Sequence, residues 1–464
     1  MLRRIRELFN DVLRQADLLL LALCGGASLF GVLMVSSATR YMHTNRLVLV
    51  QAAALVIGVL LYLLVSQIDV GELVKYWKWI FLVGIGFILL LATPLGIDGG
   101  TGNRAWLDFP FLPVKVQPAE IVKITFILVL AKQLAWLKEN RNLKSVTSVA
   151  MLAVHFGVIF VLYYKISGDM GSALVFLFIF ACMCFVAGVA LRWFLIGGGA
   201  AALLFYAMWD LNLLDSYMKK RFIVLFDHSY DPLNTGWQQT RSLLTLGGGK
   251  IFGQGLFKGV QTQSETASSL PHRHTDFIFS VIGEELGLVG CLLTLALLTA
   301  IVLRCVYVAR HAKTRLESYV CIGVAGMIIF QVIVNVGMCL FVMPVIGLTL
   351  PFISYGGSSL VSAFIVFAII QALYIIQGNE DEADEREEME EYEETPDDED
   401  EALEEDNTGI MHRPTGFFGR RAAERTPADD EEEAYLDDPD DGDASADSDD
   451  SYTAEKVSLD DLKL

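Results

Sequence analysis

The chain has 464 residues, 53% of them hydrophobic, and a mean hydropathy of +0.47. A soluble globular protein is less apolar than this, so the composition excludes a soluble enzyme and gives no reason to expect a nucleic-acid partner. The formal net charge of −20 is unevenly spread: residues 378–464 carry 36 acidic and 7 basic side chains, whereas the body before them is net positive.

Apolar runs of about 17 residues or more, long enough to cross the hydrocarbon core as a helix, recur throughout the body. The sequence therefore predicts an all-α polytopic membrane protein with about ten transmembrane helices and a large outer loop, 210–275, between helices 7 and 8. The predicted spans are 18–38, 47–66, 77–95, 121–137, 148–164, 171–190, 193–209, 277–303, 319–342 and 358–377.

Basic clusters set the expected orientation, because Lys and Arg near span ends are retained in the cytoplasm. One cluster precedes the first span, and two others follow the fourth and the eighth. With an even number of spans, both termini are then cytoplasmic and the loops 95–118, 210–275 and 341–357 face outward. The first run lacks a small-residue cleavage site and reads as a signal anchor. The basic residues are Arg3, Arg4, Arg6, Arg14, Lys138, Arg141, Lys144, Arg310, Lys313 and Arg315.

The acidic segment has few aromatic residues and no apolar period. We therefore predict a membrane domain over residues 1–377, followed by a disordered cytoplasmic tail over residues 378–464. A basic and aromatic island at 410–421 interrupts the tail, and it is either a short docking motif or an ordinary linker segment.

Asp276 is the most informative single residue, because a polar loop delivers it to the mouth of a long apolar run. An ionisable group where water thins out is costly, so this carboxylate is a functional candidate. Thr275 or Asp276 could instead cap the following helix. The two roles are compatible, since a capping carboxylate has a fixed orientation.

Other charged residues at membrane depth also have both a structural and a functional interpretation. Glu120 and Lys123 open the fourth span at i, i+3 spacing, which places them on one helix face as an ion pair. That pair serves either packing or a substrate. Asp169 follows Ser-Gly in a very short outer turn, where a turn or N-cap role is favoured over a substrate role.

The outer segments offer further candidates. Arg221 and Gln238 supply a cation and an amide suited to a sugar or phosphate ligand, although a solvated loop explains each of them. The glycine-rich stretch 245–255 could form a nest of amides around phosphate, but it lacks the Ser or Thr of a nucleotide P-loop. The Pro/Gly-broken stretch 335–359 predicts a cleft beneath the outer surface.

A metal site is not expected. His272, His274 and Asp276 would lie on one side of an extended segment, but no further ligand accompanies them. The seven cysteines all fall within or at the ends of predicted spans, which argues against disulfides and zinc.

Several strings in this order along residues 15–377 resemble the SEDS family of FtsW, RodA and SpoVE, with a slight lean to the RodA type. The resemblance implies polymerisation of lipid II, the undecaprenyl-pyrophosphate disaccharide-pentapeptide, at the bacterial plasma membrane, together with a class B penicillin-binding protein. The strings are Asn103-Arg-Ala-Trp106, Gln117-Pro-Ala-Glu120, His274-Thr-Asp-Phe-Ile-Phe279, Gly283-Glu-Glu-Leu-Gly287 and Pro351-Phe-Ile-Ser-Tyr-Gly-Gly-Ser-Ser359.

The resemblance also assigns roles. It makes Asp276 the key carboxylate, a general base for a sugar hydroxyl. The expected substrate-binding residues are Arg104, Glu120, Lys123, Asp169, Arg221, Gln238 and Ser354.

Cations in this set would stabilise the departing pyrophosphate, and a divalent cation could assist them. The alternative from another class is a flippase that moves the lipid-linked precursor across the bilayer. The polar residues gather on one side without a clear inverted repeat, which favours the enzyme. A non-catalytic scaffold would leave Asp276 without a task.

Overall fold

The computed structural model describes residues 16–98, 102–110, 114–212, 216–227, 230–231, 236–266 and 269–394. The N-terminal arginines Arg3, Arg4, Arg6 and Arg14 lie outside the described residues. The segment 395–464, with the island at 410–421, does so as well.

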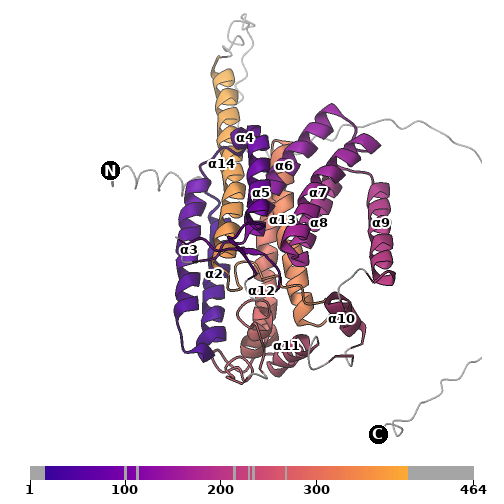
Figure 1. Ribbon diagram of the computed structural model, residues 1–464. Coiled ribbons are helices and arrows are strands. Elements are labelled where there is room, and N and C mark those ends of the chain that lie inside the picture. Colours follow the sequence, from indigo (N-terminus) through magenta and orange to yellow (C-terminus); the bar gives the residue numbers. More distant parts are fainter. Residues whose placement is uncertain are drawn as a thin grey trace, which may run out of the picture. The chain divides into compact units, whose positions relative to one another are not determined.

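Ten helices of the described chain coincide with the ten predicted spans (Figure 1). Eight of them are long and apolar enough to cross a membrane. The other two are α5, which is shorter, and α6, which carries more charged residues. This confirms an all-α polytopic membrane protein. The ten are α2 (Leu18–Thr39), α3 (Arg46–Val65), α5 (Trp77–Leu90), α6 (Pro118–Asn140), α7 (Val146–Ser167), α8 (Met170–Ala187), α9 (Leu191–Asp210), α12 (Ile278–His311), α13 (Arg315–Cys339) and α14 (Gly357–Glu394).

Shorter elements connect these helices. A 3-10 turn, η1 (Arg40–Met42), follows α2, and α4 (Val70–Lys75) precedes α5. Strands β1 (Gly96–Ile97) and β2 (Trp106–Leu107) pair antiparallel. The segment between α9 and α12 contains α10 (Ser216–Phe226) and α11 (Trp237–Gly248), so it is more regular than the outer loop that the sequence predicts.

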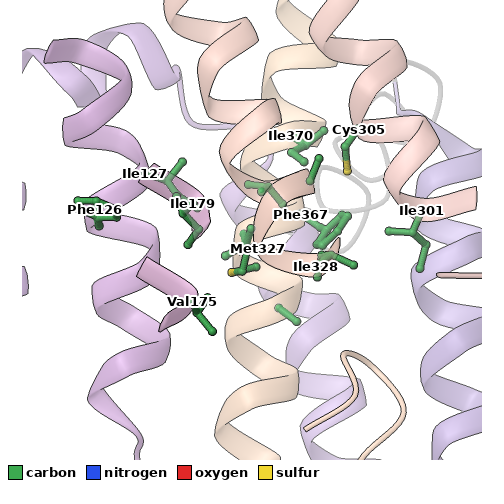
Figure 2. Close-up of a cluster of buried hydrophobic side chains, with 14 of the residues drawn as sticks. Phe126, Ile127, Val175, Ile179, Ile301, Cys305, Met327, Ile328, Phe367 and Ile370 are labelled. Atoms are coloured by element: carbon green, nitrogen blue, oxygen red, sulfur yellow. The ribbon is translucent and has the colours of Figure 1, made fainter. Parts of the chain in front are cut away.

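The core is centred on α13, which packs against α12, α8 and α6. Figure 2 shows Met327 and Ile328 of α13 between Ile127 of α6 and Ile301 of α12, with Phe367 of α14 beside them. All five side chains are buried. By contrast, α9 has no buried residue and stands apart from the other helices in Figure 1.

The helices begin and end at residues suited to those places. The side chains of Asp17, Ser145 and Thr314 accept hydrogen bonds from free backbone N–H groups at the starts of α2, α7 and α13. Gly168 and Gly188 adopt the left-handed conformation that ends α7 and α8.

Helix α12 is broken near its N-terminal end. Gly287 has φ 70° and ψ −164°, and a Cβ atom there would lie 2.3 Å from the backbone nitrogen of Gly253. The segment after α11 fills the break: Leu288 N–H donates to the Lys250 carbonyl at 2.9 Å, and Gln254 N–H donates to the Glu284 carbonyl at 2.8 Å. Only glycine fits this crossing.

Two buried carboxylates hold the next part of that segment. Glu284 accepts from the Thr262 N–H at 2.8 Å and from the Thr262 hydroxyl at 2.6 Å. Glu285 accepts from the Phe257 N–H at 3.1 Å and from the Ser37 hydroxyl of α2 at 2.7 Å. The amides beside the glycine-rich stretch therefore bind carboxylates of the protein itself.

Helix α14 continues past the expected domain boundary. Its apolar part ends at Gly378, but the helix runs on to Glu394. Glu, Ala, Met and Arg in this stretch are good helix formers, which accounts for the continuation. The start of the predicted disordered tail at residue 378 does not coincide with a helix end, and the disorder of the rest stays a prediction.

Candidate functional site

Asp276 lies in a tight turn, residues 272–277, just before α12; we call it the Asp276 turn. The N–H groups of Thr275 and Phe277 both donate to the His272 carbonyl, at 3.1 and 3.2 Å. The N-cap of α12 is Phe277, and no side chain caps the helix. The capping interpretation of Thr275 and Asp276 is therefore wrong, because the helix starts after both residues.

Three consecutive carbonyls of this turn are held by donors from the C-terminal part of the bundle. The Tyr355 N–H donates to the His274 carbonyl at 2.8 Å, and the Ser354 hydroxyl donates to the Thr275 carbonyl at 2.7 Å. The Asn335 side-chain amide on α13 donates to the Asp276 carbonyl at 2.9 Å. The backbone that carries the candidate base is thus fixed from outside its own segment.

Ser354 has a structural role in this arrangement. Its hydroxyl also accepts a hydrogen bond from the Leu350 N–H at 2.8 Å, and the residue is buried. The hydroxyl thus donates one hydrogen bond and accepts one within the protein. Ser354 supports the Asp276 turn, and its contact with substrate stays a prediction.

The loop that follows α13, residues 341–350, is also held by side chains that donate hydrogen bonds to its carbonyls. The Gln239 amide of α11 donates to the Met343 carbonyl at 2.7 Å, and the Arg221 guanidinium of α10 donates to the Val345 carbonyl. Asn335 also donates to the Leu348 carbonyl, at 2.7 Å. We call this segment the 341–350 loop, and it connects α10, α11 and α13 beside the Asp276 turn.

The surroundings of the Asp276 carboxylate favour its neutral form. Burial is the largest influence and raises the pKa of Asp276 above its ordinary value, although part of the residue remains accessible. His272, a hydrogen bond from Thr275 and the Arg221 cation oppose this shift, while Asp169 adds to it. The structure thus brings Asp276, Asp169 and Arg221 within electrostatic reach of one another.

The neighbouring His274 is held neutral. Burial and the nearby His272 and Arg273 lower the pKa of His274 to about 4. Arg273 itself is buried, with its guanidinium 3.6 Å from the Tyr41 ring. At neutral pH, His274 therefore adds no charge beside Asp276.

Asp169 is the N-cap of α8, as the sequence favours. Its carboxylate accepts from the Ser172 N–H at 3.3 Å, the Ser172 hydroxyl at 2.7 Å and the Tyr163 hydroxyl at 3.1 Å. The capping bonds fix the Asp169 carboxylate. Its negative charge also raises the pKa of Asp276, so Asp169 contributes to the electrostatic field at the candidate base.

Arg104 is an exposed residue next to the same region. Its backbone N–H donates to the Ser167 carbonyl at 2.8 Å, two residues before Asp169. Its guanidinium donates to the carbonyls of Gly96 and Thr93 at 3.0 and 2.8 Å. These bonds orient the guanidinium and leave N–H groups for an anionic ligand.

Glu120 and Lys123 form the expected ion pair, with 2.8 Å between the carboxylate and the ammonium nitrogen. Their side chains are 11% and 3% exposed, so the pair is well shielded from solvent. The pairing inferred from i, i+3 spacing is confirmed. The stability and activity of single and double variants of the pair can show whether it serves packing or binds substrate.

Gln238 lies in the first turn of α11 and is half-buried. No hydrogen bond joins it to the Asp276 turn within the part of the chain that the structure describes. The described ranges also contain no group of three His, Cys, Asp or Glu able to hold a metal ion. The divalent cation considered from the sequence therefore has no ready set of protein ligands there.

Sequence reasoning missed Gln239 and assigned no individual role to Asn335, which opens the stretch 335–359, although both residues organise this region. Both use side-chain amides to grip carbonyls about 60 to 100 residues away along the chain. The available signal was that an amide buried in an apolar helix needs partners. That signal identifies a candidate but does not reveal what it contacts.

Comparison with known proteins identifies the family. The FtsW/RodA/SpoVE cell cycle protein family matches residues 14–377. The probable peptidoglycan glycosyltransferase FtsW of Geobacter metallireducens is 34% identical over 361 residues, covering 76% of this chain and 93% of the relative. The peptidoglycan glycosyltransferase MrdB of Escherichia coli K12 is 31% identical over 319 residues, covering 68% and 82%.

Solved structures agree. A peptidoglycan synthase complex that coordinates polymerization and crosslinking contains a chain with a TM-score of 0.66 and 31% identity, covering 78% of this chain and 98% of that one. The rod shape determining protein RodA of Thermus thermophilus gives a TM-score of 0.56 at 29% identity, covering 77% and 96%. The relatives carry both FtsW and RodA or MrdB names, so the lean to the RodA type stays a prediction. The chain belongs to the SEDS family of FtsW, RodA and SpoVE, membrane-embedded peptidoglycan glycosyltransferases.

Proposed function

We propose that this protein polymerises lipid II into glycan strands, with Asp276 as the general base. The observation that carries the proposal is the Asp276 carboxylate itself. Its backbone is fixed by three donors, its pKa is raised, and it lies within reach of the Arg221 cation. A base with a pKa raised toward the working pH transfers protons more effectively than an ordinary carboxylate.

The proposed reaction is a direct displacement at the anomeric carbon of the donor, with Asp276 accepting the proton. The Asp276 carboxylate accepts the proton of the acceptor sugar hydroxyl, and the hydroxyl oxygen forms a bond to the anomeric carbon of the donor. The bond from that carbon to the pyrophosphate oxygen breaks, and the undecaprenyl pyrophosphate leaves. Direct attack inverts the configuration of the anomeric carbon.

The leaving group carries negative charge, which calls for fixed cations. Arg104 and Arg221 suit this task because hydrogen bonds to backbone carbonyls orient both guanidinium groups. The Asp169 carboxylate would contribute to the electrostatic field around the acceptor sugar. Gln238, half-buried in the first turn of α11, would contact sugar. Glu120 and Lys123 would line the substrate cavity as a neutral pair.

Lipid II is the proposed substrate and a class B penicillin-binding protein the proposed partner. Support comes from the related chain in a complex that coordinates polymerization and crosslinking. In this proposal the Asp276 turn faces outward from the plasma membrane and both termini are cytoplasmic. A lipid-linked substrate enters sideways from the membrane, which is why the polar site lies at the rim of a helical bundle.

The test compares parental protein with Asp276→Asn, each purified with its penicillin-binding protein while the transpeptidase is inhibited. We expect the parental protein to convert lipid II to polymer and Asp276→Asn to lose about 100- to 10,000-fold in turnover. This loss corresponds to about 3 to 5 kcal/mol of barrier. Near-parental turnover of Asp276→Asn would refute the general base. Movement of lipid II between leaflets of proteoliposomes without polymer would favour the flippase.

A further inference from the structure

The amide of Asn335 is placed to control two segments at once. The residue is fully buried on α13, 59 positions along the chain from Asp276. Its Nδ2 atom donates to the Asp276 carbonyl at 2.9 Å and to the Leu348 carbonyl at 2.7 Å. Carbonyl oxygens only accept hydrogen bonds, so these partners also fix which side-chain atom is the nitrogen.

The second partner matters because the 341–350 loop passes the candidate base. Gly347 precedes Leu348 and has φ +72°, and a Cβ atom built on it would lie 3.9 Å from Oδ2 of Asp276. The loop backbone is therefore one wall of the space around the carboxylate. One amide thus holds both the backbone of Asp276 and the wall beside its side chain.

This arrangement has a cost that packing does not explain. The Oδ1 atom of Asn335 is buried and has no hydrogen-bond partner among the described residues. A buried acceptor without a partner destabilises the fold. An apolar side chain would avoid that cost but would leave the Asp276 and Leu348 carbonyls without this donor. What the amide supplies is a fixed alignment of the two segments that carry these carbonyls.

We propose that Asn335 is a positioning residue, which sets the Asp276 carboxylate in register with the 341–350 loop for proton transfer. The inference rests on the proposed function of Asp276. Without Asn335, the Asp276 turn keeps its bonds from Ser354 and Tyr355, so the fold persists. The Asp276 carbonyl and the 341–350 loop then move independently of each other. More water reaches the Asp276 carboxylate as a result.

The experiment uses the full chain with its penicillin-binding protein, with transpeptidation inhibited, and lipid II as substrate. Asn335→Leu removes both donors at nearly constant volume, and Asn335→Ser is a milder second variant. The matched controls are Gln331→Met and Gln331→Ser, because Gln331 is another buried amide one turn earlier on α13. kcat, KM, melting temperature and the pH dependence of kcat are measured for each.

We expect Asn335→Leu to lower kcat about 10- to 100-fold, since misplacement by about 1 Å costs up to about 100-fold. KM should stay within about twofold of the parental value. The acid limb of kcat should move to lower pH, because hydration relaxes the raised pKa of Asp276. The other charged groups that act on Asp276 are His272 on its own turn, Arg221 on α10 and Asp169 at α8, and all are retained. The controls should show neither change.

Equal losses in the Asn335 and Gln331 variants, or a change confined to KM, would overturn the inference. Failure of both Asn335 variants to fold while the controls fold would also overturn it, in favour of a purely structural role. An inactive Asp276→Asn with parental kinetics in Asn335→Leu would overturn the inference alone. An active Asp276→Asn would overturn the proposed function and the inference together.

Discussion

At the scale of single residues, Asp276 combines a proposed catalytic role with a cost in stability. Burial raises the pKa of Asp276, so the folded protein holds the proton to higher pH than the unfolded chain does. The folded state then loses stability as pH rises from the unfolded value of about 3.9 through the raised folded value, and this loss persists at neutral pH. The surrounding bonds from Asn335, Ser354 and Tyr355 hold the residue in place despite that cost.

One prediction follows from the sign of this linkage. Asp276→Asn should unfold at the parental melting temperature or above it at pH 7, although its turnover falls. The amide keeps the shape and removes the buried charge. Thermal unfolding in detergent measures this, with Asp169→Ala as the control, because Asp169 caps α8 and loss of the cap should lower stability by about 1 kcal/mol. A clear drop in melting temperature for Asp276→Asn would contradict the prediction.

A second prediction concerns pH and rate. The base works only when deprotonated, so kcat/KM should fall on the acid side with an apparent pKa above that of an ordinary aspartate. Arg221→Gln removes a cation that opposes the shift, so its acid limb should lie at still higher pH. Polymerisation rates from about pH 4 to 8 test both statements. An acid limb at the ordinary value in the parental protein would contradict the desolvated environment.

The shielded pair of Glu120 and Lys123 gives a third prediction. Replacing one partner leaves an unpaired buried charge, which typically costs about 3 to 5 kcal/mol. Glu120→Gln and Lys123→Met should each lower the unfolding free energy by more than the double variant does. Denaturation and polymerisation are measured on all four proteins. A double variant that is stable yet as inactive as the singles would assign the pair to substrate.

At the scale of elements, the break in α12 shows what one glycine permits. The run from 277 to 303 is interrupted by Gly283-Glu-Glu-Leu-Gly287, but the sequence analysis predicts one span across it and does not predict the break. The structure departs from a regular helix at Gly287, where φ is 70° and the glycine-rich segment after α11 crosses. The break lets that segment enter the bundle and be held by Glu284 and Glu285.

Gly287→Ala should therefore be strongly destabilising. The new Cβ would meet backbone atoms at 2.3 to 2.5 Å and would hold a left-handed residue, so we expect a loss of at least about 3 kcal/mol. Gly86→Ala is the matched control: Gly86 lies in α5 with nothing within 4 Å of an added Cβ, and Ala is the better helix former. Thermal unfolding separates the two. Equal melting temperatures would mean that the crossing is not rigid.

The helices were predictable from sequence to the extent that apolar length alone defines them. All ten spans appear near the expected positions, because hydropathy over about 20 residues is a strong signal. The amphipathic helices α10 and α11 were missed, since they lie in a polar, glycine-rich segment. The Asp169 cap and the Glu120–Lys123 pair were predictable because their signals are local, whereas the catalytic role of Asp276 stays a proposal. Asn335 and Gln239 act through contacts far apart in the sequence, and no local pattern identifies such partners.

At the scale of the whole molecule, the outer site and the acidic C-terminal segment are at opposite ends of the predicted topology. Truncation after Gln377 should leave lipid II polymerisation at the parental rate, because the Asp276 turn is held by residues that precede the cut. The unfolding free energy should change by about 0.5 kcal/mol or less. Polymerisation by the purified truncated protein tests this, with melting temperature as the check on folding. Loss of polymer from a folded truncated protein would give the acidic segment a direct part in catalysis.

The extension of α14 beyond its apolar part carries acidic residues progressively further from the apolar part of the helix. A helix rises about 1.5 Å per residue, so Glu394 lies about 24 Å further along the axis than Gly378. The Debye length at physiological ionic strength is about 8 Å, so charges that far apart are almost fully screened from each other. The helix is itself acidic, with 11 Asp or Glu among residues 379–394, so only the charges in its first turns lie within a Debye length of Gly378 and act on the apolar part of the chain.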